Sequence, residues 1–433
     1  MSQLPAVVAD TIFALSSGAP PAAIAVIRIS GPHAGEALRL IAGGLPAPRR
    51  AVTRRLIGGE GEVLDRALVL WLPGPGTASG EDMAELHLHG GRAVVHAVEH
   101  ALAGLNGLRR AEPGEFTRRA FANGRIDLAE AEGLADLLAA ETELQRRSAM
   151  VMAGGAFSAL VEGWRTQLLT ASARLEAVLD FADEGDVAAT LPPEFPTEID
   201  GLRSAITSWL GRPRAEVLRE GFRVVIAGPP NAGKSTLFNA LVESDAAITT
   251  PIAGTTRDVL TRPVAIGGIP FLFADTAGLH DGVDDVVEAI GIERALEALD
   301  RADLVLWLGP EGMGPQGSWD IASQIDRPNA LRKRQPRHRV SAVTGEGMDE
   351  LRRDLVAVAS DAMPAPGEAA VNERQHRLLG DAAHALGDAR HELDPLLIAE
   401  NLRLARLAFD ALLGRTTTED MLDALFGRFC IGK

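Results

Sequence analysis

The stretch Arg223 to Leu241, RVVIAGPPNAGKSTLFNAL, decides the fold of a large part of this chain. Its apolar start predicts a strand, and the pattern G-x-x-x-x-G-K-[ST] then leads into a helix beginning near Lys234. In that context the loop N–H groups and the positive end of the helix wrap the phosphates of a nucleotide. We expect Lys234 to reach the terminal phosphates and the Ser235 hydroxyl to bind Mg²⁺.

Two motifs further along the chain indicate a GTPase-type switch rather than a generic ATPase. In FLFADTAG an apolar strand ends at Asp275 and Gly278 follows three residues later, so a carboxylate lies beside the metal and an N–H near the γ-phosphate. Between the two motifs, TPIAGTTRD begins at Thr250 and can deliver the Thr256 hydroxyl to Mg²⁺.

The element that reads the base departs from the usual N-K-x-D. After the strand DLVLWLG, the segment ASQIDRP places Ser323 and Gln324 where Asn and Lys are expected and keeps Asp326 as the guanine reader. Ser341 and Ala342 in VSAVTGEGMDEL supply the loop beside the base. The departure leaves guanine selectivity open, and GTP is the expected nucleotide.

The water-positioning glutamine that often follows D-x-x-G is replaced by Leu279, whose apolar side chain cannot orient a nucleophile. Glu288 is the candidate to take over that role. By the residues alone, a solvated surface glutamate is the favoured interpretation of Glu288.

The rest of the chain divides into further parts by its pattern of apolar and turn-forming residues. Residues 1–120 hold short β-rich runs with intervening helices, which predicts an α+β domain. Apolar residues at three- and four-residue spacing predict long helices from about Leu128 to Ala182, and helices return after the linker DAMPAPGEAAV. From Gly221 to about Ala357 strands alternate with helices, which predicts a parallel sheet covered on both faces, and Gly267-Gly268 predicts a hairpin. We infer that this α/β module is inserted into one helical domain; a separate C-terminal bundle is the alternative.

Composition narrows the class of protein. The net charge of −16 disfavours a chain that grips nucleic acid by itself, so a partner is expected to supply basic surface. The single cysteine excludes an internal disulfide and fits a reducing compartment. The N-terminal sequence does not resemble a signal peptide, and no apolar run approaches the roughly 20 residues of a membrane span. We expect a cytoplasmic protein without membrane contact.

Several segments together resemble the MnmE (TrmE) family of tRNA-modifying GTPases from near the N-terminus to Lys433. They are AVIRISG, SGEDMAELHLHGG, PGEFTRRAFANGRIDLAEAEGLADLL, GPPNAGKSTLFNAL, TPIAGTTRD, DTAGL, GIERA and the terminal FCIGK. The resemblance implies a multidomain α/β and α fold with an inserted Ras-like P-loop GTPase domain. The expected parts are residues 1–120 as a folate-binding and dimerisation domain, 121–215 and 366–433 as the helical domain, and 216–365 as the G domain.

The resemblance also implies a function. Together with the flavoprotein MnmG (GidA), the family adds an aminomethyl or carboxymethylaminomethyl group to carbon 5 of the wobble uridine of certain tRNAs. A tetrahydrofolate such as 5-formyltetrahydrofolate supplies the one-carbon unit, and GTP hydrolysis drives a conformational cycle in the homodimer.

The resemblance also implies site residues, which are the residues of this chain at the positions of the family's motifs. The implied K⁺ ligands are Asn231, Thr250, Ile252 and Thr255, and Glu288 matches the family's water-orienting glutamate. The implied folate residues are Arg28, Glu85, Lys433 and Arg125, which stands where a lysine is common. Ser235 and Thr256 are the Mg²⁺ ligands. The nucleotide-binding residues are Asn231, Ala232, Gly233, Lys234, Ser235, Thr236, Thr250, Pro251, Ile252, Ala253, Gly254, Thr255, Thr256, Asp275, Thr276, Ala277, Gly278, Asp326, Ser341 and Ala342.

Some interpretations stay open. Cys430 is either a thiol beside the one-carbon carrier or a small residue packing the tail. Glu85, His87 and His89 share one face of a strand and could line a pocket or hold a metal. The basic run Arg332 to Arg339 could touch RNA or form a solvated loop. For the whole chain, the alternatives are a regulatory or ribosome-assembly GTPase without one-carbon chemistry, and a GTPase-impaired family member.

Overall fold

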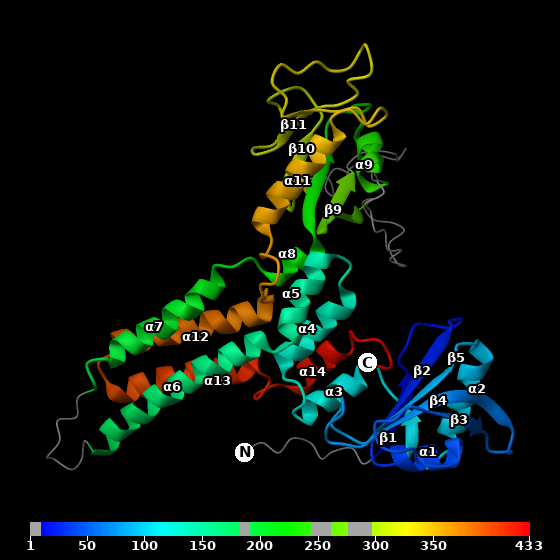
Figure 1. Cartoon of the computed structure of the whole chain (residues 1–433). Coiled ribbons are helices and arrows are strands. Elements are labelled where there is room, and N and C mark those ends of the chain that lie inside the picture. The colour runs from blue at the N-terminus through cyan, green and yellow to red at the C-terminus, as the bar shows by residue number, and fades with distance from the viewer. Residues whose placement is uncertain (1–9, 182–190, 244–260, 276–296) are drawn as a thin grey trace, which may run out of the picture. The chain divides into compact units, whose positions relative to one another are not determined.

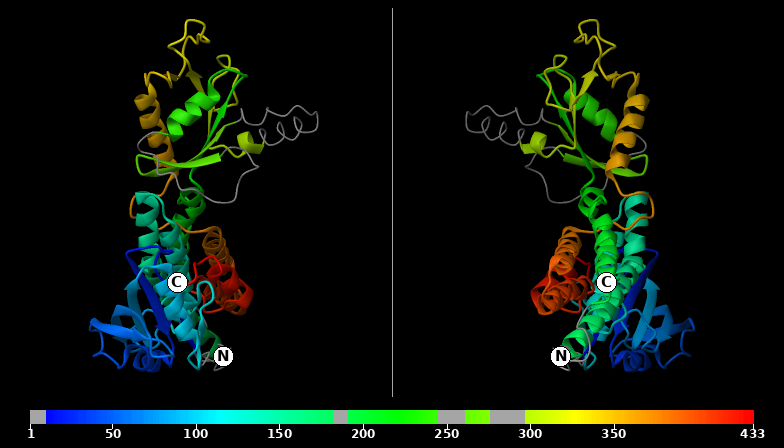
Figure 2. Two further views of the ribbon diagram at one scale, coloured as in Figure 1. Left: turned by 90° about the vertical axis from the view of Figure 1, so that its right-hand side faces the viewer. Right: turned by 90° about the vertical axis from the view of Figure 1, so that its left-hand side faces the viewer.

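The computed structural model describes residues 10–181, 191–243, 261–275 and 297–433 of the chain (Figures 1 and 2). The described residues belong to two units. The N-terminal unit comprises Met1–Ala135 together with Asp410–Lys433, and the second unit comprises Asp136–Phe409. Among the described residues, no helix combines the length and apolar character that crossing a membrane requires.

The N-terminal unit is built on a six-stranded sheet with the order β3-β4-β5-β2-β1-β6. Neighbouring strands are antiparallel except β1 and β6, which are parallel. The strands are β1 (Thr11–Leu15), β2 (Ile24–Ser30), β3 (Val52–Ile57), β4 (Val63–Leu72), β5 (Met83–His89) and β6 (Leu108–Arg110). The β-rich runs AAIAVIRIS, RALVLWLP and MAELHLHG, which the sequence predicts as strands, are β2, β4 and β5, whereas β1, β3 and β6 were not predicted.

Two helices, α1 (Ala34–Ala42) and α2 (Arg92–Ala103), pack against this sheet and form its main core. The alternation predicted for β5 is confirmed, because Ala84, Leu86 and Leu88 are buried in that core. Glu85 and His87 are only partly buried, on the opposite face. The sheet therefore has one apolar face under the helices and one face that carries polar side chains.

A smaller cluster joins the C-terminal end of the chain to the N-terminal unit. Residues of α4 (Leu128–Ala139) and α14 (Glu419–Phe426) share a core with Phe429. The helix α3 (Glu115–Ala122) is joined to α14 by Arg118, which pairs with Glu419 and Asp423. Beyond α14, Ile431 forms a bridge with Pro113. The last residues of the chain are thus part of the N-terminal unit.

The helices of the second unit come from both sides of the α/β module. They are α5 (Glu143–Ala153), α6 (Ala156–Phe181), α7 (Phe195–Leu210), α8 (Ala215–Glu220), α12 (Glu373–His391) and α13 (Pro395–Leu412). Helix α7 packs along α12, where Asp200 pairs with Arg390 at 2.6 Å, and Trp164 of α6 contacts both Trp209 and Phe409. Segments from before and after the module form one helical body, which confirms the predicted insertion.

Within the region expected to form long helices, the stretch from Leu128 to Gly154 is two helices, α4 and α5. Thr142 interrupts it, because its hydroxyl accepts a bond from the Gln145 N–H while the Gln145 side chain accepts from the Thr142 N–H. This reciprocal capping box starts a new helix inside a periodic sequence.

The α/β module is a six-stranded sheet with the order β12-β11-β10-β7-β9-β8. All neighbours are parallel except β8 and β9, which form the predicted hairpin through Gly267 and Gly268, both with positive φ. The strands are β7 (Phe222–Ala227), β8 (Thr261–Ile266), β9 (Ile269–Asp275), β10 (Leu304–Trp307), β11 (Trp319–Ala322) and β12 (His338–Arg339). Helices α9 (Lys234–Val242) and α11 (Met348–Ala362) share the core of this sheet and contact each other through Arg352 and the Ala240 carbonyl.

The expectation that helices alternate with strands throughout the module is wrong for two connections. The segments 308–318 and 323–337, which follow β10 and β11, are loops. The first contains Gly309, Gly312, Gly314 and Gly317, and prolines interrupt both, so neither sequence supports a regular helix.

Candidate functional site: a phosphate loop and a base pocket

The phosphate loop lies between β7 and α9, as the sequence predicted. Lys234 is 5% exposed, and its Nζ donates to the carbonyl oxygens of Gly228 at 2.9 Å and Pro229 at 3.0 Å. Burial lowers the pKa of Lys234, and the charge of Asp275 offsets part of that shift. The ammonium group is therefore held by its own loop through neutral partners, which leaves its charge available to a phosphate.

The start of α9 is suited to an anion. Its first turn contains no acidic residue, and Ser235 and Thr236 are exposed there. Asp275 ends β9, the strand beside β7, and is 2% exposed. A helix N-terminus with a nearby lysine and a buried carboxylate is the set of groups that binds a phosphate chain and its divalent cation.

A pocket in the same unit lies between the start of α9 and the segments that follow β11 and β12. It is lined by Gly233, Thr236, Leu237, Ser323, Gln324, Asp326, Arg327, Val340, Ala342 and Val343. The Ser341 hydroxyl donates to Asp326 Oδ1 at 2.6 Å, and this bond lowers the pKa of Asp326. An oriented, exposed carboxylate therefore lies next to the phosphate loop.

The two residues that depart from N-K-x-D also contact the phosphate loop. Ser323 Oγ donates to the Ala232 carbonyl at 2.7 Å, and Gln324 Nε2 donates to the Asn231 carbonyl at 3.2 Å. Sequence reasoning treated them as a loss and missed these bonds, since the partners lie about 90 residues earlier in the chain.

Some of the predicted site residues lie outside the described residues. Among the nucleotide-binding and Mg²⁺ predictions they are Thr250, Pro251, Ile252, Ala253, Gly254, Thr255, Thr256, Thr276, Ala277 and Gly278. The predicted K⁺ ligands Thr250, Ile252 and Thr255 and the predicted catalytic Glu288 are also among them.

In the N-terminal unit, Arg28 and Glu85 occupy directly paired positions of β2 and β5 and form an ion pair. Arg28 Nη2 lies 3.2 Å from Glu85 Oε1, and His87 Nε2 lies 3.2 Å from Glu85 Oε2. Their side chains are 20–31% exposed. The guanidinium of Arg28 also lies 5.9 Å from the ring of Phe116. This polar cluster lies on the face of the sheet opposite α1 and α2, and it can meet a ligand that has both a donor edge and a negative charge.

The other two predicted folate residues belong to the same unit. The tail passes the end of β1, since a Cβ on Gly432 would lie 2.1 Å from the Leu15 carbonyl oxygen, and Lys433 follows directly. Arg125 is exposed and lies over Gly80. The Cys430 side chain is exposed, so the packing of the tail is provided by Phe429 and Gly432 instead.

The metal interpretation of the β5 face finds no support in the described part of the chain. His89 turns to Asp65, with Nδ1 2.7 Å from Oδ1, and does not join Glu85 and His87. No cluster of three or more His, Cys, Asp or Glu side chains with metal-binding geometry occurs among the described residues.

The basic run Arg332 to Arg339 is partly structural. Lys333 is 3% exposed and donates to Asp320 and to the Trp307 carbonyl, both at 2.8 Å. The guanidinium of Arg337 lies 4.0 Å above the ring of Trp319. At least these two cations hold the loop and the edge of the sheet together.

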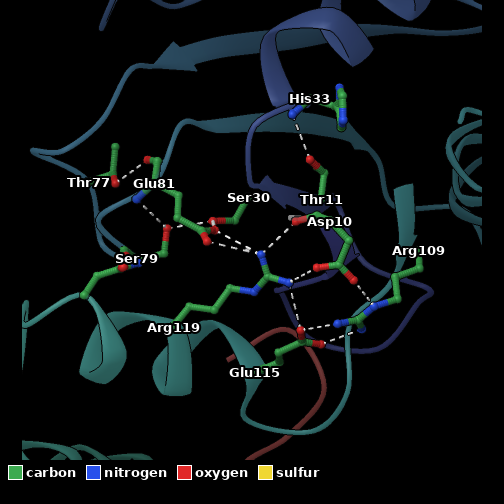
Figure 3. A network of polar contacts seen from close by, with 11 residues as sticks. Asp10, Thr11, Ser30, His33, Thr77, Ser79, Glu81, Arg109, Glu115 and Arg119 are labelled. Atoms are coloured by element: carbon green, nitrogen blue, oxygen red, sulfur yellow. Dashed lines mark hydrogen bonds and ion pairs between the residues drawn. The ribbon is translucent and has the colours of Figure 1, made fainter. Parts of the chain in front are cut away.

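A network of charged side chains in the N-terminal unit was missed by sequence reasoning (Figure 3). Arg119, 8% exposed, donates to Asp10, Glu81 and Glu115 at 2.8–3.2 Å. Arg109 also donates to Asp10 and Glu115. Burial alone would raise the pKa values of Asp10 and Glu115, but these bonds outweigh it and leave both pKa values lowered. The network fastens α3 to the strands and loops of the sheet.

The parallel sheet, the phosphate loop between β7 and α9, and the oriented carboxylate beside it define a P-loop nucleotide-binding protein of the GTPase type. A family model described as "MnmE helical domain" matches residues 128–430, and a second, described as "GTP-binding protein TrmE N-terminus", matches residues 11–125. The chain belongs to the MnmE family of tRNA modification GTPases.

Relatives of nearly the same length support this assignment. A tRNA modification GTPase MnmE from Novosphingobium aromaticivorans is 65% identical, over 98% of this chain and 100% of the relative. Those from Erythrobacter litoralis and Zymomonas mobilis are 63% and 49% identical, with the same coverage.

Solved structures give weaker likenesses. Era from Aquifex aeolicus bound to GDP and AlF₄⁻ is 23% identical with a TM-score of 0.24, covering 38% of this chain and 66% of Era. The G domain of the T. maritima FeoB iron transporter is 22% identical with a TM-score of 0.21, covering 32% of this chain and 98% of that domain.

Proposed function

We propose that this GTPase is activated by potassium and acts with the flavoprotein MnmG to add a (carboxymethyl)aminomethyl group to carbon 5 of the wobble uridine of certain tRNAs. A tetrahydrofolate carries the one-carbon unit. The observation that carries the proposal is the presence, in one member of this family, of both a phosphate-loop site and the Arg28–Glu85 pair on the polar face of the N-terminal sheet.

The nucleotide is GTP, with Mg²⁺ held by Ser235 and Thr256. The groups present fit this ligand, since α9 begins without an acidic residue and Lys234 is bonded only to neutral carbonyls in the described loop. Lys234 holds the terminal phosphates and Asp326, oriented by Ser341, accepts the donor edge of guanine. Mg²⁺, when bound, neutralises phosphate charge that develops during hydrolysis.

Potassium is assigned to Asn231, Thr250, Ile252 and Thr255, and Glu288 orients the attacking water. Asn231 is exposed at the tip of the phosphate loop, with its side-chain oxygen available as a hard ligand. The cation supplies positive charge near the phosphates when bound, where other GTPases use an arginine finger.

The folate site is assigned to Arg28, Glu85, Arg125 and Lys433. Glu85 fits the pterin because a partly exposed carboxylate can accept two hydrogen bonds from a neighbouring pair of donors. The cationic side chains suit the glutamate tail of the folate. The set draws on β2, β5, the loop after α3 and the C-terminal tail, which all belong to one unit.

We further propose that the chain acts as a homodimer and that MnmG contributes much of the grip on tRNA. The net charge of −16 supports this division, because phosphate contacts require basic surface. The functional division is residues 1–120 for folate and dimerisation, 121–215 and 366–433 for the helical domain, and 216–365 for GTP.

The decisive experiment is a deletion strain in which wobble-uridine modification is measured by mass spectrometry of digested tRNA. Loss of the modification, restored by the wild-type gene and not by E85A, is expected. A normal modification profile in the deletion strain would refute the proposal.

Two assays in vitro separate the proposed function from its competitors. GTP hydrolysis is expected to be faster in KCl than in NaCl at equal ionic strength, and the protein is expected to bind 5-formyltetrahydrofolate. Absence of folate binding together with co-sedimentation with ribosomes would favour a ribosome-assembly switch. Equal, slow hydrolysis of GTP in both salts would favour a GTPase-impaired member.

A further inference from the structure

The basic segment 327–339 carries more positive charge than the fold uses. It holds six Lys or Arg residues and no Asp or Glu, in a chain whose net charge is −16. Lys333 and Arg337 contact the edge strands of the sheet. Three further arginines of the segment are exposed, namely Arg332, Arg334 and Arg339. We call these three residues the arginine patch.

The backbone that carries the arginine patch is held by hydrogen bonds from two sides. The Glu311 carboxylate accepts from the Arg334 N–H at 2.7 Å and from the Gln335 N–H at 2.8 Å. Arg339 Nη2 donates to the Lys333 carbonyl at 3.0 Å, so Arg339 lies against the backbone next to the other two patch residues. The patch is thus presented on an anchored loop, which reduces the entropy lost when a partner binds.

The positive charge of the patch is not neutralised within the described part of the chain. Arg332 and Arg334 form no ion pair there, and Arg339 donates to backbone carbonyls rather than to carboxylates. Glu311 touches the same backbone, but it sets one carboxylate against three guanidinium groups. The patch therefore keeps an excess of positive charge for an external anion.

The chemistry of the patch fits phosphate groups. A guanidinium group is planar, stays charged and matches phosphate oxygens with parallel N–H groups. The loops that follow β10 and β11, residues 308–318 and 323–337, contain no Phe, Trp, Tyr or His on which an unpaired base could stack. Such a surface recognises the backbone of an RNA double helix by its charge and shape rather than by its base sequence.

We propose that the arginine patch binds the phosphate backbone of a double-helical arm of tRNA. The inference rests on the proposed function, which makes tRNA the substrate, and it gives this acidic chain an RNA contact of its own in addition to the grip proposed for MnmG. An anionic membrane is the competing partner, because Met313 and Leu331 are exposed on the same two loops. Membership of a tRNA-modifying family favours RNA.

The test uses the full-length protein and a fluorescently labelled tRNA transcript, whose binding is followed by anisotropy between about 50 and about 200 mM KCl. In R332Q/R334Q we expect the affinity to fall about tenfold at the lowest salt concentration. The slope of log K against log salt concentration should become shallower by about 2, one for each lost phosphate contact.

The matched control is R54Q/R55Q, which removes the same charge from two exposed arginines of β3 in the other unit. It should change the affinity for tRNA by less than about twofold, because distant exposed charges are screened by salt. The thermal midpoints of both variants should equal that of wild type, which shows that both are folded.

A charge-conserving variant separates phosphate contacts from general damage. R332K/R334K keeps both charges, so its salt slope should match that of wild type, and its affinity should fall less than that of R332Q/R334Q. If the salt slope of R332Q/R334Q equals that of wild type, or if R54Q/R55Q weakens binding as much, the patch does not contact phosphates and the proposal is wrong.

Two other anions test the RNA assignment. If R332Q/R334Q loses binding to phosphatidylglycerol vesicles while its affinity for tRNA is unchanged, the patch is a membrane surface. If a DNA duplex binds as tightly as tRNA and loses as much affinity in R332Q/R334Q, the patch attracts polyanions in general. Either outcome would overturn the assignment to RNA.

The outcomes for the patch and for the proposed function are distinguishable. If the deletion strain lacks the wobble modification while R332Q/R334Q binds tRNA like wild type, the patch is wrong and the proposed function stands. If R332Q/R334Q loses affinity as expected while the deletion strain has a normal modification profile, the RNA contact stands and the proposed function fails.

Discussion

Two buried cations in this molecule have opposite surroundings. Arg119 in the N-terminal unit is 8% exposed and faces Asp10, Glu81 and Glu115. Lys234 in the second unit is 5% exposed and donates to two backbone carbonyls. Burial opposes both charges. The carboxylates, with Glu81 contributing most, outweigh it and raise the pKa of Arg119, whereas the pKa of Lys234 is lowered.

Burial alone therefore does not distinguish a charge that binds a ligand from a charge that stabilises the fold. A cation whose hydrogen bonds go to carboxylates is neutralised within the protein and serves the fold. A cation held by neutral oxygens keeps its charge for a ligand of opposite sign. Arg119 and Lys234 both lie in sequence motifs by which the chain resembles its family. The presence of a residue in such a motif therefore does not show whether it stabilises the fold or binds a ligand.

The largest effect expected from this comparison is the loss of Arg119. The variant R119M removes the arginine bonded to Glu81, while Asp10 and Glu115 keep Arg109. Breaking a buried ion pair in this way costs about 3–5 kcal/mol. We expect β1 and α3 to lose that much protection in hydrogen exchange measured by mass spectrometry. R39M, which changes an exposed arginine of α1, should change protection by less than about 0.5 kcal/mol. Equal protection in R119M and R39M would show that the network does not stabilise the unit.

The next effect compares two of the chain's three lysines. In K234M the phosphates lose their charged partner, and GTP hydrolysis should fall about 100- to 1,000-fold. Its thermal midpoint should stay equal or rise, because a lysine with a desolvation penalty is replaced by an apolar side chain. The measurement is steady-state phosphate release together with a thermal melt.

Lys333 supplies the matched control for that experiment. It is equally buried but is paired with Asp320, so K333M should lower the thermal midpoint of the second unit and leave a folded fraction that still hydrolyses GTP. If K234M lowers the thermal midpoint as much as K333M does, the distinction between a lysine that binds a ligand and a lysine that stabilises the fold is wrong.

A smaller effect concerns the base pocket. S341A removes the hydroxyl that orients Asp326, and we expect GTP affinity to fall about tenfold, or about 1.4 kcal/mol. Affinity for ITP should change less, because hypoxanthine lacks the amino group that donates a hydrogen bond to the carboxylate. T344A alters an exposed hydroxyl of the same turn and serves as the control. Equal losses for GTP and ITP would mean that Asp326 does not read the amino group.

Sequence reasoning found the features that depend on adjacent residues. The phosphate loop, the alternation along β5 and the Gly267-Gly268 hairpin are each encoded within a few residues, and they were predicted correctly. The charge network and the Ser323 and Gln324 contacts join segments far apart in the chain; Asp10 and Arg119 are 109 residues apart. No local pattern specifies such partners, because they are selected by the folded sheet. Strand β11 was missed since its four residues follow a glycine-rich loop that carries no periodicity.

The smallest expected effect is the acid sensitivity of the N-terminal network. The folded pKa values of Asp10 and Glu115 lie below their ordinary values of 3.8 and 4.5, so the unfolded chain binds more protons in that range and stability rises with pH. Their contribution is fully present above about pH 5 and is lost as pH falls through the folded values. Glu130, whose pKa burial raises, acts in the opposite direction.

The test measures protection of β1 by hydrogen exchange, corrected for intrinsic rates, from about pH 6 down to about pH 3.5. Protection should decline on acidification in wild type and decline less in D10N/E115Q, which lacks both titrating carboxylates. The effect is smaller than in R119M because a protonated carboxyl still accepts a hydrogen bond from an arginine. If the two pH profiles coincide, these carboxylates are not stabilised by Arg109 and Arg119, and the contrast with Lys234 loses its electrostatic basis.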